Sequence, residues 1–293
     1  MDSHVEFEGA IPPDAIRNPT VAGRFYPADP RMLRQEIEKL LHRAQPEIRS
    51  ARLTALVAPH AGYSYSGSVA AHAYKLLLQA KAQTIIVIAP SHFERFPFIS
   101  VFNGKSYRTP LGELPVDHAL AARLLACDTQ FAAAWNGHRD HGGRTEHALE
   151  IQLPFLQMTR PECAIVPVVM GHQRWELCET LGHHLAKVAE EAPFVILASS
   201  DLSHYHNQEE ALQLDQRFMQ LLTAQNPRAL YDAVAQHECE ACGAGPVIAT
   251  MIAAQQLHAD QVDLLCYNTS GEASDDFSRV VGYLAASFSR AVT

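Results

Sequence analysis

Short apolar runs recur along the chain, and segments with apolar residues at every third or fourth position separate them. Apolar runs rich in Val and Ile are typical of strands that are buried on both faces of a sheet. We predict such strands at residues 53–58, 84–89, 164–170, 194–198, 262–266 and 280–286. The three-to-four-residue repeat predicts helices at residues 30–44, 68–80, 117–126, 146–157, 174–191, 208–224, 227–237 and 246–257. This alternation predicts a three-layer α/β fold with a mixed or largely parallel central sheet flanked by helices.

Cap residues mark the start of two of these helices. Asp29 can accept hydrogen bonds from the first turn of the helix at residues 30–44, and Pro30 suits that turn. Ser64, Ser66 and Ser68 are expected to cap the helix at residues 68–80.

The composition is that of an ordinary globular protein. Of the 293 residues, 47% are hydrophobic and 19% are charged, which predicts a single domain over residues 1–293, with residues 1–20 as a flexible N-terminal extension. The net charge of −9 argues against nucleic acid or an anionic membrane as the main partner, since both require a basic face. No apolar run reaches the ~20 residues of a membrane helix, and the acidic N-terminus does not resemble a signal peptide. We therefore expect a cytoplasmic protein with its six Cys reduced.

Histidine follows four of the predicted strands directly. His60, His92, His172 and His204 stand in these positions, and Asp201 accompanies the last of them. The carboxyl ends of strands in an α/β sheet form the usual ligand site, so these side chains are expected to meet there. Any one of these His alone could be a hydrogen-bonded loop residue. Four together favour a metal site, because imidazole with carboxylate suits Fe, Zn, Cu or Mn.

The pair Cys239 and Cys242 leaves several interpretations open. The spacing fits half of a zinc site, a redox pair or two inert thiols. Alternatively Cys242 alone is active, since it precedes a predicted helix whose N-terminus would favour a thiolate.

His147 and Glu150 are three residues apart in a predicted helix and would share one of its faces. There they could supply a metal ligand or orient one. The segment is not the H-E-x-x-H motif of zinc proteases.

Several longer motifs occur in the order of a known family. The sequence resembles the Memo family, whose bacterial and archaeal members are called AmmeMemoRadiSam system protein B, from Gly23 to Tyr283. The motifs are Ala58-Pro-His-Ala-Gly-Tyr-Ser-Tyr-Ser-Gly67, Pro90-Ser-His92, Tyr107-Arg-Thr-Pro-Leu-Gly112, Glu146-His-Ala-Leu-Glu-Ile-Gln-Leu-Pro154, Ser199-Ser-Asp-Leu-Ser-His204 and Ala241-Cys-Gly243. That family is similar in fold to class III extradiol dioxygenases of the LigB type, which hold non-haem Fe(II) at strand ends.

The resemblance implies a particular set of site residues. The family's metal-binding positions fall on His60, His92 and Cys242, with Asp201 and His204 beside them. It also implies iron or copper and redox chemistry. One position departs from the pattern, because similar members commonly have Arg where this chain has Ala244.

Three functional hypotheses follow. The first is a mononuclear metal redox enzyme with Fe(II) as the favoured ion, then copper and then zinc, in which His60, His92, Cys242 and Asp201 bind the metal. Here His204, Asp201 and Cys242 act in catalysis, and Tyr63, His147 and Glu150 contact the substrate. The second is hydrolysis by a zinc-bound water with His204 as base. The third is a non-enzymatic module whose cleft binds a peptide or a partner, such as another AmmeMemoRadiSam system protein.

Overall fold

The structure is a computed structural model that describes residues 10–47, 51–139 and 144–291. Its strands are β1 (Ile16–Arg17), β2 (Ala51–Ala58), β3 (Thr84–Pro90), β4 (Ile99–Val101), β5 (Ser106–Thr109), β6 (Gly112–Pro115), β7 (Phe131–Ala133), β8 (Ala164–Met170), β9 (Phe194–Ser199), β10 (His204–His206), β11 (Gln261–Thr269) and β12 (Val280–Ala291).

The helices separate most of these strands along the chain. They are α1 (Pro30–Arg43), α2 (Tyr63–Leu77), α3 (His118–Leu125), the 3-10 turn η1 (Glu150–Gln152), α4 (Leu153–Thr159), α5 (Trp175–Ala189), α6 (Gln208–Thr223), α7 (Pro227–Ala235), α8 (Ala244–Gln256) and α9 (Gly271–Ser274). Within the described ranges, no helix combines the length and the apolar character that crossing a lipid bilayer requires.

The large sheet has the strand order β10-β12-β2-β9-β3-β8-β4-β7, and β11 pairs with β12. Strands β2, β9, β3 and β8 run parallel. Strand β12 runs antiparallel to β2, β10 and β11, and β4 runs antiparallel to β8. The prediction of an α/β fold with a mixed central sheet is therefore confirmed. Strands β1, β5 and β6 form a separate small sheet.

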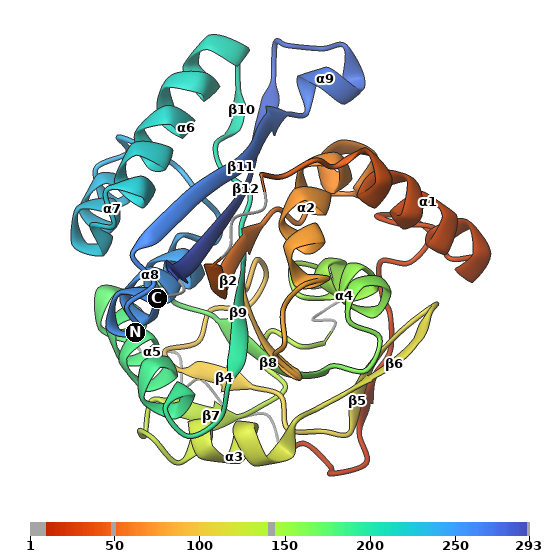
Figure 1. Cartoon of the computed structure of the whole chain (residues 1–293), viewed down its shortest axis with the longest axis vertical. Helices are drawn as coiled ribbons and strands as arrows, with labels where there is room; N and C mark the ends of the chain where they lie inside the picture. Colours follow the sequence, from red (N-terminus) through yellow and green to blue (C-terminus); the bar gives the residue numbers. More distant parts are fainter. Residues whose placement is uncertain (1–9, 48–50, 140–143, 292–293) are drawn as a thin grey trace.

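Helices cover the large sheet on both faces, which completes the three layers (Figure 1). Helix α2 packs on β2 and β12, and α1 and α4 pack against α2. On the other face α8 contacts β2, β3 and β9, with α5 packed on α8 and α6 beside β11 and β12. Strands β3 and β9 are buried along their whole length, as their apolar sequences predict.

Local structure agrees with the predicted cap at one helix start and differs from it at another. Asp29 caps α1 as predicted, since its side chain accepts from the backbone N–H groups of the first turn. The predicted serine caps are wrong, because α2 already begins at Tyr63 after Gly62, without a side-chain cap. Ser66 lies inside that helix, and its hydroxyl donates instead to the carbonyl of Ala61 at 2.9 Å.

The predicted helix over residues 146–157 is also not formed as one element. The chain passes through an irregular segment and η1 before α4 begins at Leu153. Pro154 lies in the first turn of α4, where its missing N–H costs nothing, whereas inside a longer helix it would remove a hydrogen bond.

The expected N-terminal extension covers residues 1–20, of which residues 1–9 lie outside the described part. Within residues 10–20, the side chains of Ile11 and Arg17 are buried. Arg17 reaches the loop that precedes η1, as described below.

Candidate metal centre

His60 follows β2 and is only 1% exposed. Its main-chain N–H donates to the Asp201 carboxylate at 2.7 Å, which fixes the backbone at the point where the ring leaves the strand. Pro59 precedes it and restricts Ala58 to an extended conformation. The ring therefore leaves a stiff segment of chain at the carboxyl edge of the sheet.

The hydroxyl of Ser199 determines which nitrogen of His60 carries the proton. Ser199 donates its one hydrogen to the carbonyl of Ala148 at 2.7 Å and accepts from the Gln152 side-chain amide at 2.7 Å. Its remaining contact, 2.9 Å from His60 Nδ1, must then be a hydrogen bond that Nδ1–H donates. His60 Nε2 is consequently unprotonated and has a lone pair available for a metal.

His92 follows β3 and is held by Glu146. One oxygen of Glu146 accepts from the main-chain N–H of His92 at 2.6 Å, and the other lies 3.0 Å from Nδ1. Burial opposes a charge on His92, but the hydrogen bond and the charge of Glu146 outweigh it and raise the pKa of His92. With Nδ1 bonded to the carboxylate, Nε2 is the nitrogen that remains for a ligand.

Cys242 reaches the same edge from the turn that precedes α8. Its Sγ lies 3.1 Å from His60 Nε2 and accepts from the main-chain N–H of Asp201 at 3.3 Å. The close packing of this turn requires Gly243, where a Cβ would lie 2.2 Å from the Ser199 carbonyl oxygen. Burial and the nearby Asp201 raise the pKa of the Cys242 thiol well above its usual range.

His60, His92 and Cys242 can therefore offer two imidazole nitrogens and one sulfur to a single ion. The three donor atoms lie within 4.8 Å of one another. A metal with bonds of about 2.0–2.3 Å holds its donors roughly 3–4.5 Å apart, so the arrangement fits an ion with small adjustments. This is the convergence that the sequence predicts for these three residues.

Asp201 and His204 lie beside this group. Burial raises the pKa of Asp201 to about 6, although the N–H of His60 opposes the shift. His204 Nδ1 donates to the carbonyl of Leu202 at 2.7 Å, so in the neutral ring Nε2 is the nitrogen with the lone pair. Among the described residues, neither belongs to the set of donors within 4.8 Å, so their predicted roles as ligand and acid or base remain predictions.

His147 also reaches the site. Its ring stacks on His92 with the centroids 4.8 Å apart and lies 5.5 Å from the ring of His60. Burial lowers its pKa to about 4, against the opposing charge of Glu146. His92, Glu146 and His147 form a second group of potential donors that shares His92 with the first.

Three residues that the sequence predicts for the site are not among its potential metal donors. Tyr63 is buried in α2, where its hydroxyl donates to the carbonyl of Ile151 at 2.8 Å. His172 follows β8, and its main-chain N–H donates to Phe96. Glu150 forms a buried ion pair with Arg17 and accepts from the Tyr26 hydroxyl at 2.6 Å, so its carboxylate is already occupied.

Sequence reasoning assigned no role to Glu146, Ser199 or Arg17. Arg17 donates to the main-chain carbonyl of Glu146 at 2.8 Å and so supports the residue that holds His92. Glu146 and Ser199 stand within the quoted family motifs, which was the available signal for them. Spacing did not mark Arg17, because the partners that connect it to the site, His138, Glu146 and Glu150, lie more than 120 residues away.

Comparison with known proteins identifies the family of this chain. A family model described as "Memo-like protein" matches residues 17–287. The chain belongs to the Memo family. It is 35% identical over 289 residues to a MEMO1 family protein of Methanopyrus kandleri, covering 94% of this chain and 99% of that protein. A MEMO1 family protein of Methanococcus maripaludis strain S2 is 38% identical over 283 residues, covering 91% of this chain and 97% of that protein.

A solved structure shares the fold of this Memo protein. The uncharacterized protein JW3007 from Escherichia coli K12 superposes with a TM-score of 0.53 at 15% identity, over 81% of this chain and 100% of that one. The likeness extends to the fold alone. Ala244, where the resemblance implies an Arg, begins α8 and is buried.

Proposed function

We propose that this Memo-family protein is a metal-dependent oxidoreductase that holds one iron or copper ion on His60, His92 and Cys242. The proposal rests mainly on one observation, the 3.1 Å approach of Cys242 Sγ to the unprotonated Nε2 of His60. A buried imidazole nitrogen and a partly buried sulfur at this separation, with a third donor within 4.8 Å, are a typical set for a transition metal. Mixed nitrogen and sulfur donors suit Cu and Fe and are unsuited to Mg or Ca.

A bound ion of this kind would supply electron transfer and a coordination position for dioxygen, the oxidant, beside the substrate. The protein's own residues prepare the site for it. Ser199 and Glu146 each bind the Nδ1 atom of one imidazole, which sets the protonation and direction of His60 and His92. Asp201 accepts the main-chain N–H of His60 and so fixes that ring's backbone.

His204 is the residue that we propose moves a proton. Its Nδ1–H is bound to the Leu202 carbonyl, so Nε2 can accept a proton from a substrate and return it. An imidazole suits this role at neutral pH. The proposed reaction class is dioxygenase-like oxidation, with a catechol as the first substrate to examine.

The metal content decides between this proposal and metal-assisted hydrolysis. Protein purified anaerobically without chelators should contain about one iron or copper per chain, and the Cys242→Ser variant should contain less. The iron-loaded protein should consume oxygen with a catechol, and His204→Ala should slow turnover by roughly 10²–10⁴-fold without removing the metal. Zinc as the sole bound metal, or the absence of oxygen uptake with iron or copper bound, would contradict the proposal.

A further inference from the structure

A small cavity adjoins the candidate metal centre. It has a volume of about 270 Å³, and its lining includes His147, the aromatic rings of Phe25 and Phe93, and the arginines Arg24 and Arg144. The ring of Phe25 lies 4.7 Å from that of His147, and Phe93 lies 6.2 Å from His92. The cavity thus lies beside His147, whose ring stacks on that of His92.

The charge at this cavity is positive. Arg24 and Arg144 are exposed, and neither has an ion-pair partner among the described residues. In the described residues 144–150, the two carboxylates are engaged elsewhere, because Glu146 is bonded to His92 and Glu150 to Arg17. In a chain with a net charge of −9, two guanidinium groups that have no ion-pair partner among the described residues and lie beside the candidate metal donors favour an anionic ligand.

The walls of the cavity restrict the ligand further. Phe25, Phe93 and His147 present ring faces and edges, which favour a flat apolar body. The volume is below the roughly 300–1,000 Å³ of sites for drug-sized ligands, so it suits a single ring or a molecule of that size.

We propose that Arg24 and Arg144 bind the anionic group, a carboxylate or a phosphate, of a small planar substrate whose body lies between Phe25 and Phe93. As the substrate subsite of the metal centre, this inference rests on the proposed function. Planar guanidinium groups bind both kinds of anion through paired N–H donors.

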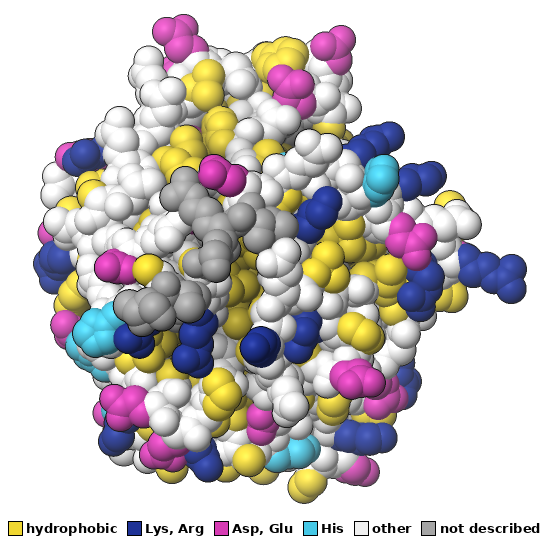
Figure 2. All heavy atoms as spheres, viewed as in Figure 1, with side chains coloured by type: hydrophobic (Ala, Val, Ile, Leu, Met, Phe, Trp, Pro, Cys, Tyr) yellow, Lys and Arg dark blue, Asp and Glu magenta, His cyan; other side chains and the backbone are white. Residues whose placement is uncertain are grey.

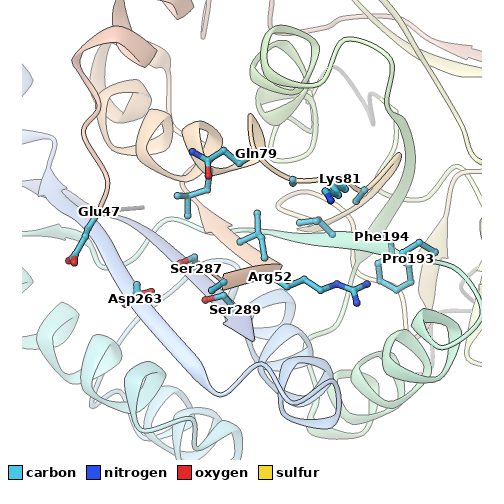
Figure 3. A pocket seen from close by; sticks show the side chains of 15 residues that line it. Glu47, Arg52, Gln79, Lys81, Pro193, Phe194, Asp263, Ser287 and Ser289 are labelled. Carbon is cyan, nitrogen blue, oxygen red and sulfur yellow. The ribbon is translucent and has the colours of Figure 1, made fainter. Parts of the chain in front are cut away.

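A second, larger cavity contains an arginine that can serve as a control for Arg24 and Arg144. It has a volume of about 560 Å³ and lies at the opposite edge of the parallel strands, among the first residues of β2 and β9. Figure 3 shows Arg52 and Lys81 on its lining, together with Phe194 and Pro193. The face drawn in Figure 2 has a central hollow with apolar side chains in it and basic side chains at its lower edge. Arg52 is likewise an exposed arginine on the lining of a cavity, but it is remote from His60, His92 and Cys242.

Calorimetric titration of the full chain with benzoate, phenyl phosphate and neutral benzyl alcohol tests the proposal, before and after removal of metal with a chelator. At least one of the two anions should bind more tightly than benzyl alcohol by about tenfold or more, and the better of the two identifies the anionic group. Arg24→Ala and Arg144→Ala should each weaken that binding by roughly tenfold, with partial recovery in Arg24→Lys. Arg52→Ala, the matched control, should bind the anions like the unmodified chain.

The outcomes separate this inference from the proposed function. Equal binding of the neutral probe, loss of binding in Arg52→Ala, or unchanged binding in the Arg24→Ala/Arg144→Ala double variant would overturn the subsite. Loss of anion binding after the metal is removed would also overturn the subsite, because the metal and not the arginines would then bind the anion. The proposed metal centre would not be contradicted by that result. Arginine-dependent binding in a protein that takes up no metal would support the anion subsite and reject the oxidoreductase.

Discussion

The Glu146 carboxylate forms two hydrogen bonds with His92, one with the main-chain N–H of His92 and one with its ring nitrogen Nδ1. The same carboxylate also accepts from the main-chain N–H groups of His147 and Ala148 at 2.9 and 3.0 Å. Four N–H groups thus converge on one buried carboxylate. They and the adjacent His lower the pKa of Glu146 although burial acts in the opposite direction.

Replacement of Glu146 by Gln should therefore weaken metal binding. The amide would turn an NH₂ group toward backbone N–H donors, and His92 would lose its fixed orientation. We expect affinity for the metal to fall by about 10- to 100-fold, as measured by competition with a chelator of known affinity. Glu113→Gln, which changes a partly exposed ion pair on β6, is the control and should leave affinity unchanged. Equal affinities in the two variants would show that Glu146 does not position His92.

The two cysteines of the Cys239–Cys242 pair should behave differently. Cys242 lies beside His60, whereas Cys239 is fully buried in the hydrophobic core. Cobalt(II) bound to the unmodified chain should show a sulfur-to-metal charge-transfer band in the near ultraviolet. Cys242→Ser should abolish that band, while Cys239→Ser should retain it. A band that survives Cys242→Ser would exclude this sulfur as a ligand.

The buried ion pair of Arg17 and Glu150 should be costly to break. Arg17→Met leaves the Glu150 carboxylate buried without its cation, for which we expect a loss of about 3–5 kcal/mol in the free energy of unfolding. The exposed pair Arg108–Glu113 serves as control, and Arg108→Met should cost about 1 kcal/mol or less. Urea denaturation of the chelator-treated protein measures both. Equal losses would show that the buried pair has no special structural role.

His138 should make stability depend on pH. Burial lowers its pKa from 6.5 to about 3, and the ring is 1% exposed. Between these pH values the unfolded chain binds a proton that the folded chain does not, so stability should fall as the pH decreases from 6.5 toward 3. The shift corresponds to about 5 kcal/mol at most.

His138→Asn removes this titration and keeps an acceptor for Tyr107, whose hydroxyl lies 2.6 Å from Nδ1. The variant should lose less stability on acidification than the unmodified chain, by urea denaturation at a series of pH values. His237→Asn, an exposed position with a positive φ that Asn tolerates, should retain the full pH dependence. Parallel pH profiles for the unmodified chain and His138→Asn would contradict the assignment.

The parts of the fold that depend on local pattern are predictable from the sequence. Strand β8 matches its predicted bounds, residues 164–170, because every position there suits burial on both faces. Strands β4 and β7 have only three residues each and give too short a pattern to detect. The directions of β11 and β12 depend on pairing between distant segments, which periodicity does not encode.

In the candidate site, too, local sequence predicts some residues, whereas others depend on contacts between distant segments. His60 and His92 are predictable because each follows a buried strand directly. His172 also follows such a strand, but this strand, β8, is separated from β2 by β9 and β3 in the sheet. Only the order of the strands in the sheet determines which strand ends are neighbours. The prediction for Glu150 assumed a regular helix from residue 146, and the actual irregular segment turns its carboxylate to Arg17. Contacts between residues so far apart in sequence follow from the fold and cannot be read from spacing.

Gly243 limits how this site can change. Any side chain there would meet the carbonyl of Ser199, which belongs to the same strand end that fixes the proton of His60. A substitution at this one position would therefore disturb the sulfur and an imidazole together, although it touches neither. Efforts to redesign the site for another substrate should keep this residue and vary Arg24 and Arg144 instead.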